Sequence, residues 1–287
     1  MAADPARLRQ FREEGGCFEL APRTVIRVGG ADRLRYLNGQ MSNDLRKLKA
    51  GEAMDALVLT AKGKLCAVVS VWLEGDAIIV EADAAVEESL LPRLERYAIS
   101  DDVSFDLVTP APVGWHVFGT AAKDLAGTRI RRLGEAGIDV VEQPAQVAVA
   151  STDEIEILRI ERGVPRWGRE LNEDALPQEA GLEETAVDFH KGCYVGQEVV
   201  SRIESVGRVN RALRGFIGSF PPEAGELVSV TGEKAGRLTS AVLEPKSGKT
   251  IALGYLSTRV EGTSFSVMDE SGACLGEAER SEFPLVS

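Results

Sequence analysis

The sequence predicts an α+β protein with three parts: two regions that mix helices with strands, and a third made of strands alone. The chain has 287 residues, enough for two or three domains of about 100–150 residues each. Helical and strand-like patterns alternate up to about residue 210, and only short β-like segments separated by turns follow. Apolar residues make up 44% of the chain, enough to bury a core, which excludes a disordered protein.

The first region, residues 1–110, should form a sheet with two helices. A helix is expected from Asp32, a residue suited to an N-cap, to Gly39. A second helical pattern covers residues 83–97, and Pro92 should kink or break it because proline removes a backbone donor. Pro110 and Pro112 mark the end of the region. The expected strands are residues 24–28, 57–60, 64–73, 77–82 and 103–108.

The second region, residues 111–210, again mixes both kinds of element, with strands expected at 115–118 and 147–150. Ser151 and Glu154 have the capping-box spacing directly before a helical run. Residues 163–188 contain two prolines, several acids and few apolar residues, so they should form an extended loop. A loop of this length in a compact chain is usually functional or disordered.

The third region, residues 211–287, should be a small antiparallel sandwich or barrel. No helical period is present, and glycine-containing turns separate the β-like segments. Those segments are residues 213–217, 227–230, 237–243, 251–256, 264–268 and 273–278.

Charge and hydropathy exclude several classes of protein. The chain has 33 Lys and Arg against 45 Asp and Glu, a net charge of −12. A field this negative argues against a protein that coats DNA or RNA, so we expect no direct nucleic-acid partner. The longest near-apolar run, residues 65–73, is far shorter than the roughly 18 residues of a membrane span. We therefore expect no association with a membrane.

The cysteines favour a reduced, cytoplasmic setting. The four are Cys17, Cys66, Cys193 and Cys274, too dispersed for a disulfide framework or a Cys-x-x-Cys pair. With only two histidines, no local zinc motif can be built, so we expect no metal site. The N-terminal segment has no apolar run of the secretory type.

The most unusual segment surrounds Cys193. It reads Lys-Gly-Cys-Tyr-Val-Gly-Gln-Glu over residues 191–198, with two glycines that permit tight bends and a helix expected from Gln197. Lys191 and the helix N-terminus both favour a thiolate, which makes Cys193 a candidate reactive thiol. The alternative is a buried, inert cysteine. A cysteine protease is not favoured, because His190 is a neighbour in sequence and no other triad signal is present.

Positive charge gathers around this segment. Five cations and two acids lie between Phe189 and Arg214, giving a local charge of +3. Arginine forks suit carboxylates and phosphates, so a ligand with an anionic group could bind here. The alternative is a solvated stripe with local ion pairs such as Glu198–Arg202.

Other candidates carry weaker signals. Glu161 could accept hydrogen bonds from a heterocycle edge, although an acid on an amphipathic helix is most often solvated. Trp167 could stack on a ligand, although tryptophan is more often a core residue. Neither a P-loop nor a GxGxxG motif occurs in the chain.

Residues 191–198 resemble the K-G-C-Y-x-G-Q-E signature of the YgfZ-type folate-binding proteins, relatives of the glycine cleavage T-protein, an aminomethyltransferase. The resemblance covers nearly the whole chain and implies a three-domain GcvT-like ring with a C-terminal β-barrel and a central folate pocket. Further similar blocks are residues 30–44, 59–64, 158–165, 176–179, 236–241 and 251–255.

The resemblance also implies a cofactor, partners and a site. The cofactor is tetrahydrofolate, and the role is to assemble or maintain iron–sulfur enzymes, including those that modify tRNA. The partners would be iron–sulfur assembly proteins or client iron–sulfur enzymes. Cys193 would act as a reactive thiol or transient ligand, and Glu161 would hold the pterin edge. The other implied folate-binding residues are Asn43, Lys191, Tyr194, Gln197, Glu198 and Arg202.

One departure from the family pattern bears on activity. In the T-protein, paired aspartates follow the hairpin, whereas here residues 65–69 read Leu-Cys-Ala-Val-Val. An apolar strand cannot stabilise positive charge at a folate nitrogen, so aminomethyl transfer is not favoured. The alternative functions are a folate-dependent one-carbon transferase or demethylase, and an interaction protein with a vestigial pocket. Whether the protein catalyses a reaction is left open.

Overall fold

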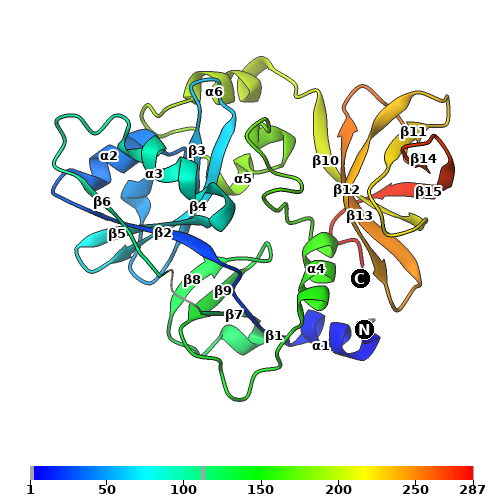
Figure 1. The fold of residues 1–287 in the computed structure, drawn as a ribbon, viewed down its shortest axis with the longest axis horizontal. Helices are drawn as coiled ribbons and strands as arrows, with labels where there is room; N and C mark the ends of the chain where they lie inside the picture. The colour runs from blue at the N-terminus through cyan, green and yellow to red at the C-terminus, as the bar shows by residue number, and fades with distance from the viewer. Residues whose placement is uncertain (1–2, 111–113, 287) are drawn as a thin grey trace.

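A computed structural model describes residues 3–110 and 114–286, and Figure 1 shows its three antiparallel sheets. The strand orders are β3-β4-β5-β2-β6, β1-β7-β9-β8, and a closed barrel β10-β13-β12-β11-β14-β15. In Figure 1 the five-stranded sheet and the barrel lie at opposite ends, with the helix of residues 152–161 and the segment after it between them. The predicted α+β fold with a C-terminal barrel is confirmed.

The five-stranded sheet has two faces of different character. On one face, Ala67, Val69 and Val71 pack under the helices of residues 33–40 and 87–95. On the other face lie Val68 and Ser70, because successive side chains of a strand alternate between faces. The elements are β2 (Arg23–Gly29), α2 (Arg33–Gln40), η1 (Leu45–Lys47), β3 (Met54–Leu59), β4 (Leu65–Glu74), β5 (Ala77–Asp83), η2 (Ala84–Val86), α3 (Glu87–Glu95) and β6 (Ser104–Leu107).

The four-stranded sheet includes the N-terminal strand, so one segment crosses the predicted boundary near residue 110. Cys17 of β1 pairs with Val117 of β7, and Phe11 of α1 packs near Phe118. The residues expected as a strand at 147–150 make only one parallel bridge, from Val149 to Cys17. Residues 111–113, including the predicted marker Pro112, lie outside the described residues. The elements are α1 (Pro5–Glu13), β1 (Gly15–Glu19), β7 (Trp115–Gly119), η3 (Thr120–Ala122), β8 (Thr128–Arg131), β9 (Ala136–Val140) and α4 (Thr152–Glu161).

Residues 162–210 connect the two ends of the molecule. The expected long loop contains η4 (Pro177–Glu179) and α5 (Glu183–Ala186), and α6 (Gln197–Val206) follows it. This segment also crosses a predicted boundary, because Tyr194 and Val200 share a buried cluster with Leu57 and Leu65 of the five-stranded sheet. The helix α4 begins with the predicted capping box of Ser151 and Glu154.

The barrel closes where β10 pairs with β15, which leaves no free sheet edge. Phe216, Leu238 and Phe265 fill its interior, while Leu213 and Leu253 pack outward in a cluster with Leu158 of α4. Across the described residues, no helix combines the length and apolar character that crossing a membrane requires. The strands are β10 (Arg211–Ser219), β11 (Glu226–Ser229), β12 (Lys234–Glu244), β13 (Lys249–Ser257), β14 (Ser264–Met268) and β15 (Cys274–Ser281).

Candidate functional site

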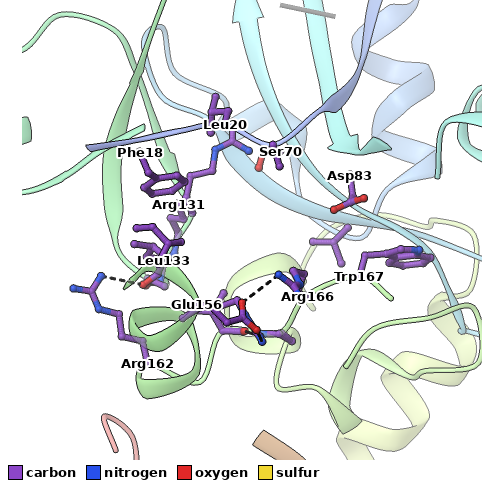
Figure 2. Close-up of a pocket in the computed structure, with 18 of the residues that line it drawn as sticks. Phe18, Leu20, Ser70, Asp83, Arg131, Leu133, Glu156, Arg162, Arg166 and Trp167 are labelled. Atoms are coloured by element: carbon purple, nitrogen blue, oxygen red, sulfur yellow. Dashed lines mark hydrogen bonds and ion pairs between the residues drawn. The ribbon is translucent and has the colours of Figure 1, made fainter. Parts of the chain in front are cut away.

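A cavity of about 880 Å³ lies where the five-stranded sheet, the four-stranded sheet and α4 meet (Figure 2). Its walls come from residues 18–23, from β3 and β4, from the β8–β9 turn at 131–134, and from residues 149–167 and 180–186. Cavities of roughly 300–1,000 Å³ are typical of small-molecule sites. The cavity is therefore large enough for a ligand of cofactor size.

The wall formed by β3 and β4 carries a partly buried carboxylate, Asp55. Asp55 and Ser70 are register partners on these strands, and the Ser70 hydroxyl donates a hydrogen bond of 3.1 Å to Asp55 Oδ1. Arg131 Nε lies 3.9 Å from Asp55 Oδ2, and the Asp55 side chain is 18% exposed. Burial raises the pKa of Asp55 above its usual value. The opposite wall faces this carboxylate across the cavity.

A second carboxylate, Glu156 on α4, is neutralised by arginines. It accepts hydrogen bonds of 2.7 and 2.9 Å from Arg159 and one of 3.1 Å from Arg166. Burial opposes ionisation of Glu156, but the hydrogen bonds from Arg159 and the positive charges of Arg159, Arg166 and Arg169 together outweigh it and lower the pKa of Glu156. Both oxygens of Glu156 are therefore engaged within the protein.

Aromatic and cationic side chains complete the lining. Figure 2 shows Phe18 and Trp167 on opposite sides of the cavity, with Arg166 between them beside Glu156 and Arg162 at the lower left near Leu133. Flat rings stack on flat ligands, and arginine forks recognise carboxylates and phosphates. The arrangement suits a flat heterocycle with N–H donors and an anionic tail.

The predicted pterin-binding acid, Glu161, does not line this cavity. It is buried at the end of α4, where Arg12 of α1 donates hydrogen bonds of 2.9 to 3.1 Å to both carboxylate oxygens. Burial raises the pKa of Glu161, and the hydrogen bond from Arg12 opposes that rise. On the same helix, Glu156 is the acid that lines the cavity, because it lies more than one turn nearer the N-terminus.

Lys191 is buried and fixed by backbone carbonyls. Its Nζ donates hydrogen bonds of 2.6, 2.7 and 2.6 Å to the carbonyl oxygens of Asn38, Met41 and Asn43, and it lies 5.3 Å from the centre of the Tyr194 ring. Burial lowers the pKa of Lys191 to about 8. With three donors and three acceptors, this ammonium group holds the turn after α2 in place.

Asn43 and Tyr194 share this arrangement but not the cavity lining. The Asn43 side-chain amide donates to the carbonyl oxygens of Asp55 at 2.8 Å and Thr185 at 3.3 Å. The Tyr194 hydroxyl is buried without a hydrogen-bond partner among the described residues, and burial raises its pKa to about 12. Asn43 therefore stands directly behind the wall that carries the Asp55 carboxylate.

Cys193 lies on the surface with the start of α6. Its thiol is free and exposed, so the alternative that this cysteine is buried is wrong. Gln197 is half-buried and Glu198 and Arg202 are exposed, and none of these three lines the cavity. No ion pair joins Glu198 to Arg202 in the described part of the chain. Within residues 3–110 and 114–286, no three His, Cys, Asp or Glu side chains gather as metal ligands.

The structure thus separates the predicted site into three places. Asn43, Lys191 and Tyr194 come together behind the cavity wall, Cys193 and the start of α6 lie on the surface, and Glu161 faces α1. Sequence reasoning missed Asp55, Ser70 and Arg131 in the cavity itself. A signal was present, because Asp55 is an acid within an otherwise apolar strand.

The fold is similar to that of an aminomethyltransferase. The structure of the glycine cleavage system aminomethyltransferase T from Bartonella henselae has a TM-score of 0.80 and 16% sequence identity, over 98% of this chain and 89% of that chain. An Aminomethyltransferase from Rubrobacter xylanophilus is 27% identical, over 88% of this chain and 78% of the relative. A comparison with protein-family profiles finds no match.

Other relatives carry the name tRNA-modifying protein YgfZ. The protein from Shigella sonnei is 27% identical, over 85% of this chain and 86% of the relative, and that from Yersinia enterocolitica is 27% identical, over 70% and 71%. Together with the shared fold, these matches show that the chain is similar to YgfZ-type proteins and has an aminomethyltransferase-like fold.

Proposed function

We propose that this protein binds tetrahydrofolate and serves as an accessory protein for iron–sulfur cluster assembly or repair, supporting tRNA-modifying iron–sulfur enzymes indirectly. The observation that carries the proposal is the separation of a folate-sized cavity from an exposed thiol, Cys193, on the surface motif. The name of the YgfZ relatives supports the link to tRNA modification. The net charge of −12 supports an indirect link through client enzymes.

The residues of the cavity fit tetrahydrofolate. A folate has a flat pterin with N–H donors, an aromatic linker and an anionic glutamate tail. Asp55 offers an acceptor, Phe18 and Trp167 offer ring faces, and Arg166 offers positive charge. When bound, tetrahydrofolate supplies ring nitrogens that can carry a one-carbon unit.

Cys193 is positioned for chemistry with a partner. Lys191 fixes the backbone two residues before it through three carbonyl groups, and the thiol itself is exposed. An accessible thiol on a fixed support can meet an iron–sulfur assembly protein or a client enzyme as a reactive group or transient ligand.

The alternative, folate-dependent one-carbon transfer to or from a small amine, is less well supported. The β4 wall presents Val68 to the cavity, in the strand where the family pattern has paired aspartates. An apolar side chain stabilises no positive charge. Turnover of a methylated or aminomethyl donor with tetrahydrofolate would favour the alternative.

Folate binding is tested by titrating the purified protein with tetrahydrofolate while binding is measured by calorimetry and by tryptophan fluorescence. We expect saturable binding, and we expect Trp167→Phe to reduce the fluorescence change because Trp167 lines the cavity. A protein that binds no folate would contradict the proposal and point to an interaction protein with a vestigial pocket.

The role of the thiol is tested by complementation. In a strain lacking this protein, we expect the intact chain to restore the activity of client iron–sulfur enzymes and Cys193→Ala to fail. Cys274→Ala is the matched control, because Cys274 is also a free, exposed cysteine but lies on the barrel. Full rescue by Cys193→Ala would remove the proposed role of this thiol.

A further inference from the structure

Asp55 differs from the other carboxylates that line the cavity. Glu156 is held by two arginines, Asp83 caps the backbone of Ala85 and lies 3.9 Å from Arg23, and Glu19 is exposed. In the described part of the chain, Asp55 receives a side-chain hydrogen bond from Ser70 alone, at Oδ1. Its second oxygen, Oδ2, has no hydrogen-bond partner among the described residues, and Asp55 lines the cavity.

This open acceptor is not explained by the packing of the sheet. Arg131 lies 3.9 Å from Oδ2, beyond hydrogen-bond distance, and donates instead to the carbonyl of Gly134 at 2.6 Å. A largely buried carboxylate is costly unless it is hydrogen-bonded. Since neighbouring Val68 and Leu57 are apolar, the strands themselves need no acid here.

We infer that Asp55 is the anchor for the heterocycle of the bound folate, with its carboxylate accepting hydrogen bonds from the N–H edge of the pterin ring. This inference rests on the proposed folate-binding function. It assigns the role to a residue of β3, whereas the resemblance to known proteins assigned it to Glu161. A carboxylate has the geometry to accept two parallel N–H bonds from a 2-amino-pyrimidinone edge.

The inference also fixes the orientation of the ligand. Figure 2 shows Ser70, the partner of Asp55, near the top of the cavity and Arg166 below it beside Glu156. With the pterin at the β3–β4 wall, the glutamate tail would extend toward Arg166. The acid at the wall and the cation below it would then match the N–H edge and the anionic tail of the ligand.

The surface motif reaches this anchor through two hydrogen bonds. Lys191 donates to the carbonyl of Asn43 at 2.6 Å, and the Asn43 side chain donates to the carbonyl of Asp55 at 2.8 Å. Lys191 and Asn43 are thus positioning residues for Asp55. Hydrogen bonds therefore link the cavity wall at Asp55 to the segment that contains Cys193.

The test compares Asp55→Asn with the intact chain by calorimetric titration with tetrahydrofolate, a pterin without the tail, and 4-aminobenzoylglutamate. Because the variant loses charge-assisted hydrogen bonds, its affinity for tetrahydrofolate and for the pterin should fall about 10- to 100-fold. Binding of 4-aminobenzoylglutamate should not change, because this ligand lacks the pterin edge that Asp55 would hold. Asp106→Asn, an exposed site on edge strand β6 of the same sheet, should behave as the intact chain.

Two further measurements keep the outcome interpretable. Thermal unfolding should show Asp55→Asn folded, because the change removes a buried charge and keeps the side-chain size. Ser70→Ala keeps the carboxylate, so the affinity for tetrahydrofolate should fall only a few-fold. If the intact chain binds tetrahydrofolate and Asp55→Asn binds it equally well, the anchor is wrong and the proposed function stands. If the intact chain binds no folate, both are overturned.

Discussion

Arg12 and Glu161, 149 residues apart, form an ion pair in which the guanidinium group donates to both carboxylate oxygens. The same arginine reaches Glu244 of the barrel at 3.4 Å. One side chain of α1 therefore joins the end of α4 to β12. This contact explains why Glu161 is turned away from the cavity although it belongs to the helix that lines it.

The first prediction concerns this ion pair. Arg12→Ala should lower the free energy of unfolding by about 3–5 kcal/mol, because it leaves two buried glutamates without their cation. Urea unfolding measures the loss. Arg27→Ala is the control, since Arg27 pairs with exposed acids and should cost less than about 1 kcal/mol. Equal losses in the two variants would contradict a structural role for the Arg12 contact.

A second prediction separates Glu161 from the ligand. Glu161→Gln keeps the size of the side chain and lies outside the cavity lining, so tetrahydrofolate affinity should stay within about twofold of the intact chain. The same calorimetric titration that is used for Asp55→Asn measures it. A large loss of affinity with unchanged stability would mean that Glu161 contacts the ligand after all.

The fold was largely predictable because its signals are local. The capping box at Ser151, the strand pattern of β3 to β5 and the glycine-rich turns of the barrel each depend on residues close in sequence. The placement of β1 was not predictable in this way. Its pairing with β7 joins Cys17 to Val117, a contact that no local pattern encodes.

The site was predictable only in part, for the same reason. The motif around Lys191 stands out in sequence, and its residues do gather in the structure. Asp55 belongs to the cavity through the face of β3 on which it lies, and that face is set by pairing with β4. The role of Glu161 was predicted from the family resemblance alone, and a resemblance does not reveal that Arg12 forms an ion pair with this glutamate.

A third prediction concerns pH and Lys191. Lys191→Met should lower the free energy of unfolding by about 2–4 kcal/mol near neutral pH, because three buried carbonyls lose a charged donor. The pKa of Lys191 is lowered from 10.5 to about 8 by burial, so between these values the unfolded chain binds more protons than the native protein. The stability of the intact chain relative to the variant should then rise with pH.

Unfolding in urea at pH values from 7.5 to 9.5 tests this slope. The range ends below the region in which Tyr194, with its pKa raised to about 12 by burial, would add a slope of opposite sign. A stability difference that stays flat over this range would mean that the three carbonyl groups compensate for the burial of the ammonium group.

The fourth prediction concerns the two glycines that flank Cys193 and Tyr194. Gly196 has φ of +88°, and a Cβ there would lie 2.6 Å from the Thr60 carbonyl oxygen. At Gly192 a Cβ would meet nothing within 4 Å. Gly196→Ala should therefore cost about 2–4 kcal/mol of stability, from left-handed strain and from the close approach of the hairpin.

Gly192→Ala, as the matched control, should stay within about 0.5 kcal/mol. Gly196 lies where the start of α6 contacts the β3–β4 hairpin, so Gly196→Ala should also unfold at a lower temperature than Gly192→Ala. Equal stability of the two variants would mean that the motif tolerates a shift away from the hairpin.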